Sequence, residues 1–248
     1  MTKLSVNVNK IAWLRNARGG NVPDLSNVSK LILESGSHGI TVHPRPDLRH
    51  ILPKDVYELS DLTNIFSKEF NIEGNPFSSK TKIYDGFMEI VRITQPIQCT
   101  LVPDSHDQLT SDHGWNLLTM NQRLEDCIIE IKELGTRVSL FIDPDIEQVI
   151  QAKEIGADRI ELYTGPYAVE YALKSKDLNI LEVYKNASEY ANSIGLEVNA
   201  GHDLNLQNLS TFLSIGGIAE VSIGQALISD SLVHGIPNII KEYLKLCV

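Results

Sequence analysis

The segment Gly39-Ile-Thr-Val-His-Pro-Arg-Pro-Asp-Leu-Arg-His50 joins an apolar, β-branched run to two histidines, two arginines and a carboxylate. This order indicates a buried strand whose end enters a polar, partly cationic site. The same pattern recurs at 70–73, 138–143, 159–161 and 196–202. Functional side chains at the carboxyl ends of several parallel strands are typical of a TIM barrel.

Short β-rich runs alternate with longer helical periodicities along the whole chain. They predict eight strands, at 4–8, 39–43, 68–73, 97–102, 137–142, 158–162, 196–200 and 219–223. Helices are predicted at 25–36, 54–66, 82–94, 119–134, 144–155, 205–214 and 225–245, with an extra helix in 166–194, where 174–179 forms a break. The fold class is therefore α/β, a TIM (β/α)8 barrel with extra helices, and its 248 residues fit a single domain over 1–248.

Start and stop signals agree with this alternation. Asp143 is predicted to cap the helix that begins at Pro144, while Gly135, Gly156 and Gly195 follow helices as breakers. The longer loops at 15–24, 44–53 and 103–118 are expected on the face formed by the strand ends, as possible lids.

Composition narrows the class of protein. A formal net charge of −10 opposes nucleic-acid binding, which needs clustered cations. Three widely spaced cysteines, no secretory leader and no apolar run of about 20 residues predict a cytoplasmic protein without a membrane partner. Several cations nevertheless follow the first two strands and predict a positive pocket for small anions: Lys10, Arg15, Arg18, Arg45 and Arg49.

His43 is a candidate general base. If Val42 faces the outer helices, then His43 points toward the barrel axis near its mouth. A structural hydrogen-bonding role is the alternative. The proline-stiffened loop after it, with Arg45, Arg49 and His50, reads as a phosphate clamp, and a solvated loop paired to Asp47 is the alternative.

Glu73 ends a predicted strand, and Glu161 follows Ile160 near the end of another. Burial at a barrel mouth would raise the pKa of either carboxyl group toward the range useful for proton transfer, and a nearby arginine would oppose this. For each glutamate, a structural salt bridge within the barrel explains the sequence as well as a catalytic role does.

His202 follows Asn199-Ala-Gly at the end of the seventh strand and is a second acid/base candidate, with room for a ligand beside it. After the eighth strand, Gly224 and Gln225 begin a helix whose backbone N–H groups suit phosphate. A metal site made of Asp104, His106, Asp112 and His113 has no familiar spacing, and no cofactor motif is present, so we expect neither metal nor cofactor.

Several blocks together resemble the pyridoxine 5′-phosphate synthase family: 6–19, which contains Leu-Arg-Asn-Ala-Arg18, Gly39–Arg45, Asn71-Ile-Glu, Thr100-Leu-Val-Pro, 138–143 and Val198-Asn-Ala-Gly-His. The resemblance runs in order from about residue 4 to residue 245. It implies a homo-octameric TIM barrel that condenses 1-deoxy-D-xylulose 5-phosphate with 3-amino-2-oxopropyl phosphate, giving pyridoxine 5′-phosphate, phosphate and water.

The resemblance also implies residue roles. In the family, the residues that match His43 and Glu73 accept protons. The residue that matches His202 donates a proton, and the residue that matches Glu161 stabilises the transition state. Asn7 and Arg18 would hold the aminoketone phosphate. Arg45, His50 and Thr110 would hold the deoxyxylulose phosphate.

The chain departs from the family pattern at four expected ligand contacts. The family commonly has Asp-His at Asn9-Lys10, Gly at Asp203 and His at Gln225. Asp203 would add a negative charge beside a phosphate unless its side chain turns away.

Two other readings remain open. One is a phosphosugar isomerase or aldolase on the same barrel, which a Schiff-base lysine would distinguish, and Lys10 is the candidate near the mouth. A catalytically silent barrel that binds a phosphorylated metabolite is the third, and the presence of His43, Glu73 and His202 argues against it.

Overall fold

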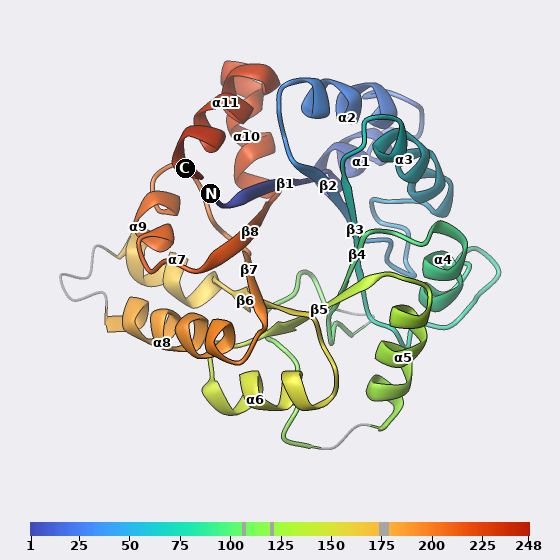
Figure 1. Cartoon of the computed structure of the whole chain (residues 1–248). Helices are drawn as coiled ribbons and strands as arrows, with labels where there is room; N and C mark the ends of the chain where they lie inside the picture. The colour runs from blue at the N-terminus through green and yellow to red at the C-terminus, as the bar shows by residue number, and fades with distance from the viewer. Residues whose placement is uncertain (106–107, 120–121, 174–178) are drawn as a thin grey trace.

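A computed structural model describes residues 1–105, 108–119, 122–173 and 179–248. Eight parallel strands close into a barrel in sequence order, as Figure 1 shows. They are β1 (Lys3–Asn7), β2 (Gly39–Val42), β3 (Glu69–Gly74), β4 (Gln98–Leu101), β5 (Arg137–Ile142), β6 (Arg159–Tyr163), β7 (Glu197–Gly201) and β8 (Ile218–Ile223). The predicted TIM barrel is confirmed, and the boundaries of all eight strands lie within one residue of those predicted.

The inner face of the barrel is polar. Residues that alternate with the buried apolar ones point inward, and Ser5, Thr41, Asn71 and Thr100 hydrogen-bond across it. The Ser5 and Thr41 hydroxyls are 2.7 Å apart, and the Thr100 hydroxyl donates to Asn71 Oδ1 at 3.1 Å. Parallel strands covered by helices usually read as continuous apolar runs. Here most apolar side chains of the strands face the helices, and Phe141, whose ring lies beside Tyr163 and His202, faces inward.

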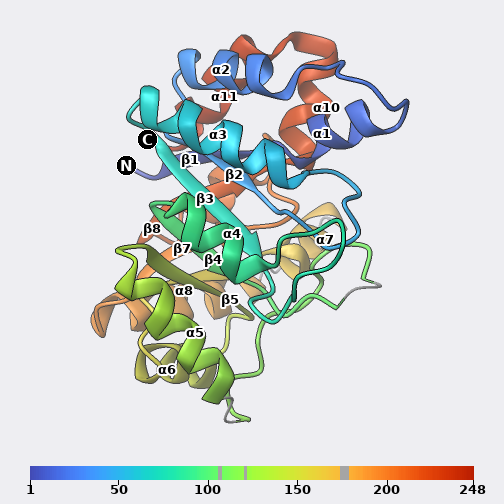
Figure 2. The ribbon, with the colours of Figure 1, turned by 90° about the vertical axis from the view of Figure 1, so that its right-hand side faces the viewer.

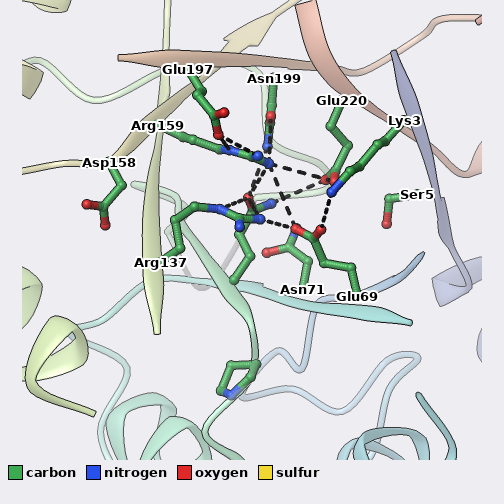
Figure 3. A network of polar contacts seen from close by, with 12 residues as sticks. Lys3, Ser5, Glu69, Asn71, Arg137, Asp158, Arg159, Glu197, Asn199 and Glu220 are labelled. Atoms are coloured by element: carbon green, nitrogen blue, oxygen red, sulfur yellow. Dashed lines mark hydrogen bonds and ion pairs between the residues drawn. The ribbon is translucent and has the colours of Figure 1, made fainter. Parts of the chain in front are cut away.

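Charged side chains fill the amino-terminal end of the barrel (Figure 3). Lys3 Nζ lies 3.2 Å from Glu69 Oε2, and Arg159 Nη2 lies 2.6 Å from Glu197 Oε2. Arg137 also pairs with Glu69. Because these cations and carboxylates pair with one another, this end is a structural layer of the barrel.

Helices surround the barrel. They are α1 (Asn9–Asn16), α2 (Leu25–Glu34), α3 (Pro53–Ile65), α4 (Phe87–Thr94), α5 (Gln122–Glu133), α6 (Ile146–Glu154), α7 (Gly165–Ala172), α8 (Asn179–Ser193), α9 (Leu209–Leu213), α10 (Gln225–His234) and α11 (Ile236–Leu246). The extra helix predicted in 166–194 is present, since α7 and α8 both lie there. Most of the predicted break at 174–179 falls outside the described residues.

Four helix predictions need correction. Asp145, not Asp143, caps α6 and accepts from Glu147 N at 2.8 Å. The single helix predicted at 225–245 is two, because Gly235 takes φ +79° and Pro237 follows it. The helix predicted from 82 begins at Phe87, and the one predicted from 205 begins at Leu209 after an asparagine-bonded turn.

Helix α1 was not predicted at all. It follows β1 directly, and its N-cap position is Val8, which offers no side-chain cap. A short helix with no capping residue gives little sequence signal.

In the described part of the chain, no helix combines the length and apolar character needed to cross a membrane.

Candidate active site

The carboxyl ends of the strands and the long loops that follow β3 and β4 lie on the side away from the two chain termini (Figure 2). His43 is buried there at the end of β2. Val42 packs outward in the apolar core, so the inward placement predicted for His43 is confirmed. Asn9 Oδ1 accepts from His43 N at 2.9 Å, and Asn7 Oδ1 accepts from Asn9 N at 3.0 Å. Asn9 therefore holds the His43 backbone in place.

Burial, followed by the nearby charges of Arg45 and His202, lowers the pKa of His43 to about 3. His50 lies with its ring centroid 6.2 Å from that of His43. Burial, followed by the charge of His43, lowers the His50 pKa to about 3. Both imidazoles are therefore uncharged at neutral pH.

Glu73 and Glu161 share the barrel mouth. Asn7 Nδ2 donates to Glu73 Oε2 at 3.2 Å. Burial raises the pKa of Glu73 well above its usual value, and the charge of Glu161 raises it further. Burial raises the pKa of Glu161 to about 8, with a further contribution from Glu220. Neither glutamate forms a salt bridge to the described residues, so the sequence alternative of a structural ion pair is not what the structure contains.

Glu161 depends on a glycine beside it. A Cβ atom on Gly201 would lie 2.2 Å from Glu161 Oε1, so any larger residue would displace the carboxyl group. The other oxygen, Glu161 Oε2, is buried and has no hydrogen-bond partner in the part of the chain that the structure describes. A buried polar atom of this kind is costly to leave unpaired, which fits an atom that meets a ligand.

His202 stands on strained backbone at the end of β7, with φ +82°. Thr164 N–H donates to Gly201 O at 2.9 Å, and the Thr164 hydroxyl donates to His202 O. The rings of Phe141 and Tyr163 both lie with centroids 5.5 Å from the His202 ring. Burial lowers the pKa of His202, and Asp203 opposes this effect.

Asp203 also has positive φ, +56°, and is exposed. Asn208 Nδ2 donates to its carbonyl oxygen at 3.0 Å. Aspartate tolerates the left-handed region better than most residues, so it can occupy a position where glycine is common in the family. The exposure of Asp203 agrees with a side chain that turns away from the mouth.

The two arginines of the predicted phosphate clamp, Arg45 and Arg49, are both paired with carboxylates of the protein itself. Arg49 pairs with Asp47 at 2.5 Å, which was the alternative considered from sequence. Arg45 pairs instead with Asp104 at 2.7 Å and donates to the carbonyls of Ser105 and Gln108 at 3.0 and 2.8 Å. Arg45 thus fastens the loop after β4 to the mouth.

Arg15 does not contribute to a positive pocket, contrary to the sequence prediction. It is buried, and its Nη1 and Nη2 lie 2.6 and 2.8 Å from the two carboxylate oxygens of Asp55. Asn16 Nδ2 donates to His50 O at 2.7 Å. The positioning role of Arg15 and Asn16 could not be predicted, because α1, which carries both residues, was not predicted.

The remaining predicted contacts lie around the rim. Arg18 and Thr110 are exposed, and Arg18 has no ion-pair partner in the described ranges. Lys10 lies with Nζ 4.3 Å from the Trp13 ring centroid, and burial followed by the charge of Arg49 lowers its pKa. Gly224 and the exposed Gln225 begin α10 beside Asn7, as the sequence predicted for this helix start.

The metal site considered at Asp104, His106, Asp112 and His113 is not formed by the described residues, among which no group of three potential ligands could hold an ion. His106 lies outside those residues. His113 Nδ1 is 2.6 Å from Asp112 Oδ1 on the surface.

The raised pKa of Glu161 predicts a loss of stability as the pH rises from about 5 to about 8. The folded state retains a proton up to about pH 8 that the unfolded chain releases near its ordinary pKa of 4.5, so the free energy of unfolding falls as the pH rises through this window. One such group contributes a slope of up to about 1.4 kcal/mol per pH unit. Glu161→Gln should therefore flatten the decline that urea unfolding measures between about pH 5 and pH 8. An unchanged slope would show that Glu161 ionises freely in the folded protein.

Comparison with known proteins gives consistent matches over the whole barrel. The family model described as pyridoxal phosphate biosynthesis protein PdxJ matches residues 4–248. Pyridoxine 5′-phosphate synthase of Xanthomonas axonopodis pv. citri (strain 306) is 50% identical over 244 residues, covering 98% of this chain and 95% of that protein. The protein of the same name from Xylella fastidiosa (strain M23) is 48% identical, covering 98% and 94%.

Solved structures share the fold at low identity. The tryptophan synthase A-subunit from Pyrococcus furiosus superposes with a TM-score of 0.65 at 12% identity, covering 98% of this chain and 97% of that one. Thiamine phosphate pyrophosphorylase from the same organism gives 0.62 at 14% identity, covering 99% and 95%. At such identities the likeness supports the TIM barrel alone.

Proposed function

This chain belongs to the PdxJ family of pyridoxal phosphate biosynthesis proteins, and we propose that it is a pyridoxine 5′-phosphate synthase. The reaction condenses 1-deoxy-D-xylulose 5-phosphate with 3-amino-2-oxopropyl phosphate and closes the pyridine ring, releasing phosphate and water. Amine attack on a ketone, dehydration, phosphate elimination and closure each move protons. Such a sequence needs several acid/base groups around one pocket.

The observation that carries the proposal is the convergence of His43, Glu73, Glu161 and His202 at one barrel mouth. His202 lowers the pKa of His43, and Glu161 raises that of Glu73, so each pair lies within electrostatic reach. His43 is uncharged and so is available to accept a proton, and dianionic substrates would raise its basicity. Glu73 is the second acceptor and His202 the donor.

Glu161 acts in this scheme as a neutral acid. With a pKa of about 8 it retains its proton at neutral pH and can donate a hydrogen bond to oxygen that becomes negative in the transition state. Its unpaired Oε2 supports this assignment, because a ligand atom would supply the missing partner.

Contacts to the two phosphorylated substrates are assigned to residues of the mouth and of its rim. Asn7 and Arg18, with Gly224 and Gln225 at the start of α10 and Asp203 nearby, would hold the aminoketone phosphate. Arg45, His50 and Thr110, with Asn9 and Lys10, would hold the deoxyxylulose phosphate. The backbone bond from His43 to Asn9 leaves the Asn9 amide nitrogen to contact substrate.

We assign the enzyme to the cytoplasm, with no cofactor and no nucleic-acid or membrane partner, and to a homo-octamer. Exposed apolar side chains on two helices support assembly: Trp13 and Leu14 on α1, and Leu232 and Val233 on α10.

Phosphate release provides the test of this activity. The native protein is expected to release phosphate only when both phosphorylated substrates are present, and omission of either should abolish the signal. Release from deoxyxylulose phosphate alone, or no release from the folded protein with both, would contradict the proposal.

A Schiff-base aldolase is the alternative that one observation favours, since the lowered pKa of Lys10 makes its free amine more available. Borohydride added with each substrate separates the two activities. A covalent adduct on native protein that Lys10→Arg lacks would favour the aldolase, and an absence of adduct alongside turnover would favour the synthase.

A further inference from the structure

A pocket of about 400 Å³ lies beside His43. Part of its lining comes from the segment 75–86, which joins β3 to α4 (Figure 2). Lys80, Ser79 and Asn75 line it from that segment, and Arg45 and Asp104 line it from the facing loops. None of the phosphate contacts assigned above comes from 75–86.

The segment 75–86 is fixed against the mouth. Tyr84 is buried, and its hydroxyl donates to Pro44 O, next to His43, at 3.1 Å. Thr81 N donates to Tyr84 O at 2.8 Å, and Phe87 N donates to Ser78 O at 3.0 Å. Gly86 takes φ +89°, and a Cβ atom there would lie 3.0 Å from Lys80 N. Lys80 is therefore presented from a defined backbone.

Lys80 differs from the other cations that line the pocket because no carboxylate of the described residues pairs with it. Arg45 is neutralised by Asp104 at 2.7 Å, and His43 is uncharged. Lys80 has no carboxylate partner among the residues that the structure describes, and it is the cation there whose charge is not balanced. Arg45 uses one Nη1–H and both Nη2–H groups on protein oxygens, and within the described ranges Nε–H and one Nη1–H of its five donors have no partner.

We propose that Lys80, together with the Ser79 hydroxyl and the remaining donors of Arg45, binds a phosphate dianion in this pocket. The inference rests on the proposed function and deepens it, because the group would be the phosphate of deoxyxylulose phosphate, delivered beside His43. Arg45 orients the phosphate through N–H groups, while Lys80 supplies the net charge that the Arg45–Asp104 pair cannot. Free phosphate has the same chemistry and is the other source.

The test compares Lys80→Ala with Lys82→Ala, which removes an exposed lysine of the same segment that does not line the pocket. Calorimetric titration of the full-length protein with inorganic phosphate and with deoxyxylulose phosphate measures binding without turnover. Lys80→Ala is expected to weaken binding of deoxyxylulose phosphate by about 10-fold or more, and Lys82→Ala by less than about 2-fold. In turnover, Lys80→Ala should raise KM for that substrate and leave kcat nearly unchanged.

Unchanged affinity in Lys80→Ala, or an equal loss in Lys82→Ala, would overturn the inference, because the effect would then be absent or one of overall charge. A loss seen only with inorganic phosphate would assign the pocket to free phosphate and overturn its assignment to the substrate. Lys80-dependent binding of deoxyxylulose phosphate by a native protein that makes no product would support the site while refuting the proposed synthase.

Discussion

Glu73→Gln is expected to lower kcat by about 10²- to 10⁴-fold, the range that a general acid/base group contributes. The amide has the size of the carboxyl group and can still accept the hydrogen bond from Asn7, so the site should keep its shape. What it loses is the ability to take a proton at a position where burial has made the carboxylate a stronger base than usual. Steady-state phosphate release with both substrates measures the effect.

Glu58→Gln on α3 is the matched control, because that glutamate is exposed on an outer helix and is assigned no role in the active site. It should turn over like the native protein. If Glu73→Gln also retained native kcat, Glu73 would be a binding or structural residue, and the assignment of proton transfer to it would be wrong.

Asp55→Ala is expected to destabilise the fold by about 3–5 kcal/mol, since it leaves the Arg15 guanidinium buried without its counter-charge. The carboxylate also accepts from Leu52 N at 2.8 Å at the start of α3, so the helix end loses a bond as well. Urea unfolding measures the change. Asp61→Ala, at an exposed position on the same helix, should cost less than about 0.5 kcal/mol.

The paired replacement Arg15→Leu with Asp55→Leu should recover much of the lost stability, because it removes both buried charges together. Equal destabilisation by Asp55→Ala and the paired variant would show that the hydrogen bonds, and not the uncompensated charge, dominate. Both variants should also disturb His50, whose carbonyl accepts from Arg15 and Asn16.

The barrel could be predicted from sequence because each strand is a short β-rich run between helical periods. Segments such as 39–43 show both the apolar outer face, in Val42, and the point where polar residues begin, at His43. The placement of His43, Glu73, Glu161 and His202 at strand ends followed from the same pattern, since parallel strands present their carboxyl ends to one face.

Charge pairing could not be predicted, because it depends on residues far apart in sequence. Arg45 meets Asp104 across 59 positions, and Arg15 meets Asp55 across 40. Sequence placed all of these arginines in one positive pocket, whereas the fold neutralises them individually. Helix α1 escaped prediction for a local reason, the absence of a capping side chain at Val8. The break between α10 and α11 did carry a signal, in Gly235 and Pro237, which the apolar periodicity around it outweighed.

Mass spectrometry of the product formed from 1-deoxy-D-xylulose 5-phosphate and 3-amino-2-oxopropyl phosphate is the most direct measurement, made on the native protein beside His43→Ala and Glu73→Gln. We expect pyridoxine 5′-phosphate from the native protein and little from either variant. No product from folded native protein supplied with both substrates would contradict the proposed synthase and direct attention to Asn9, Lys10, Asp203 and Gln225 as marks of a different substrate.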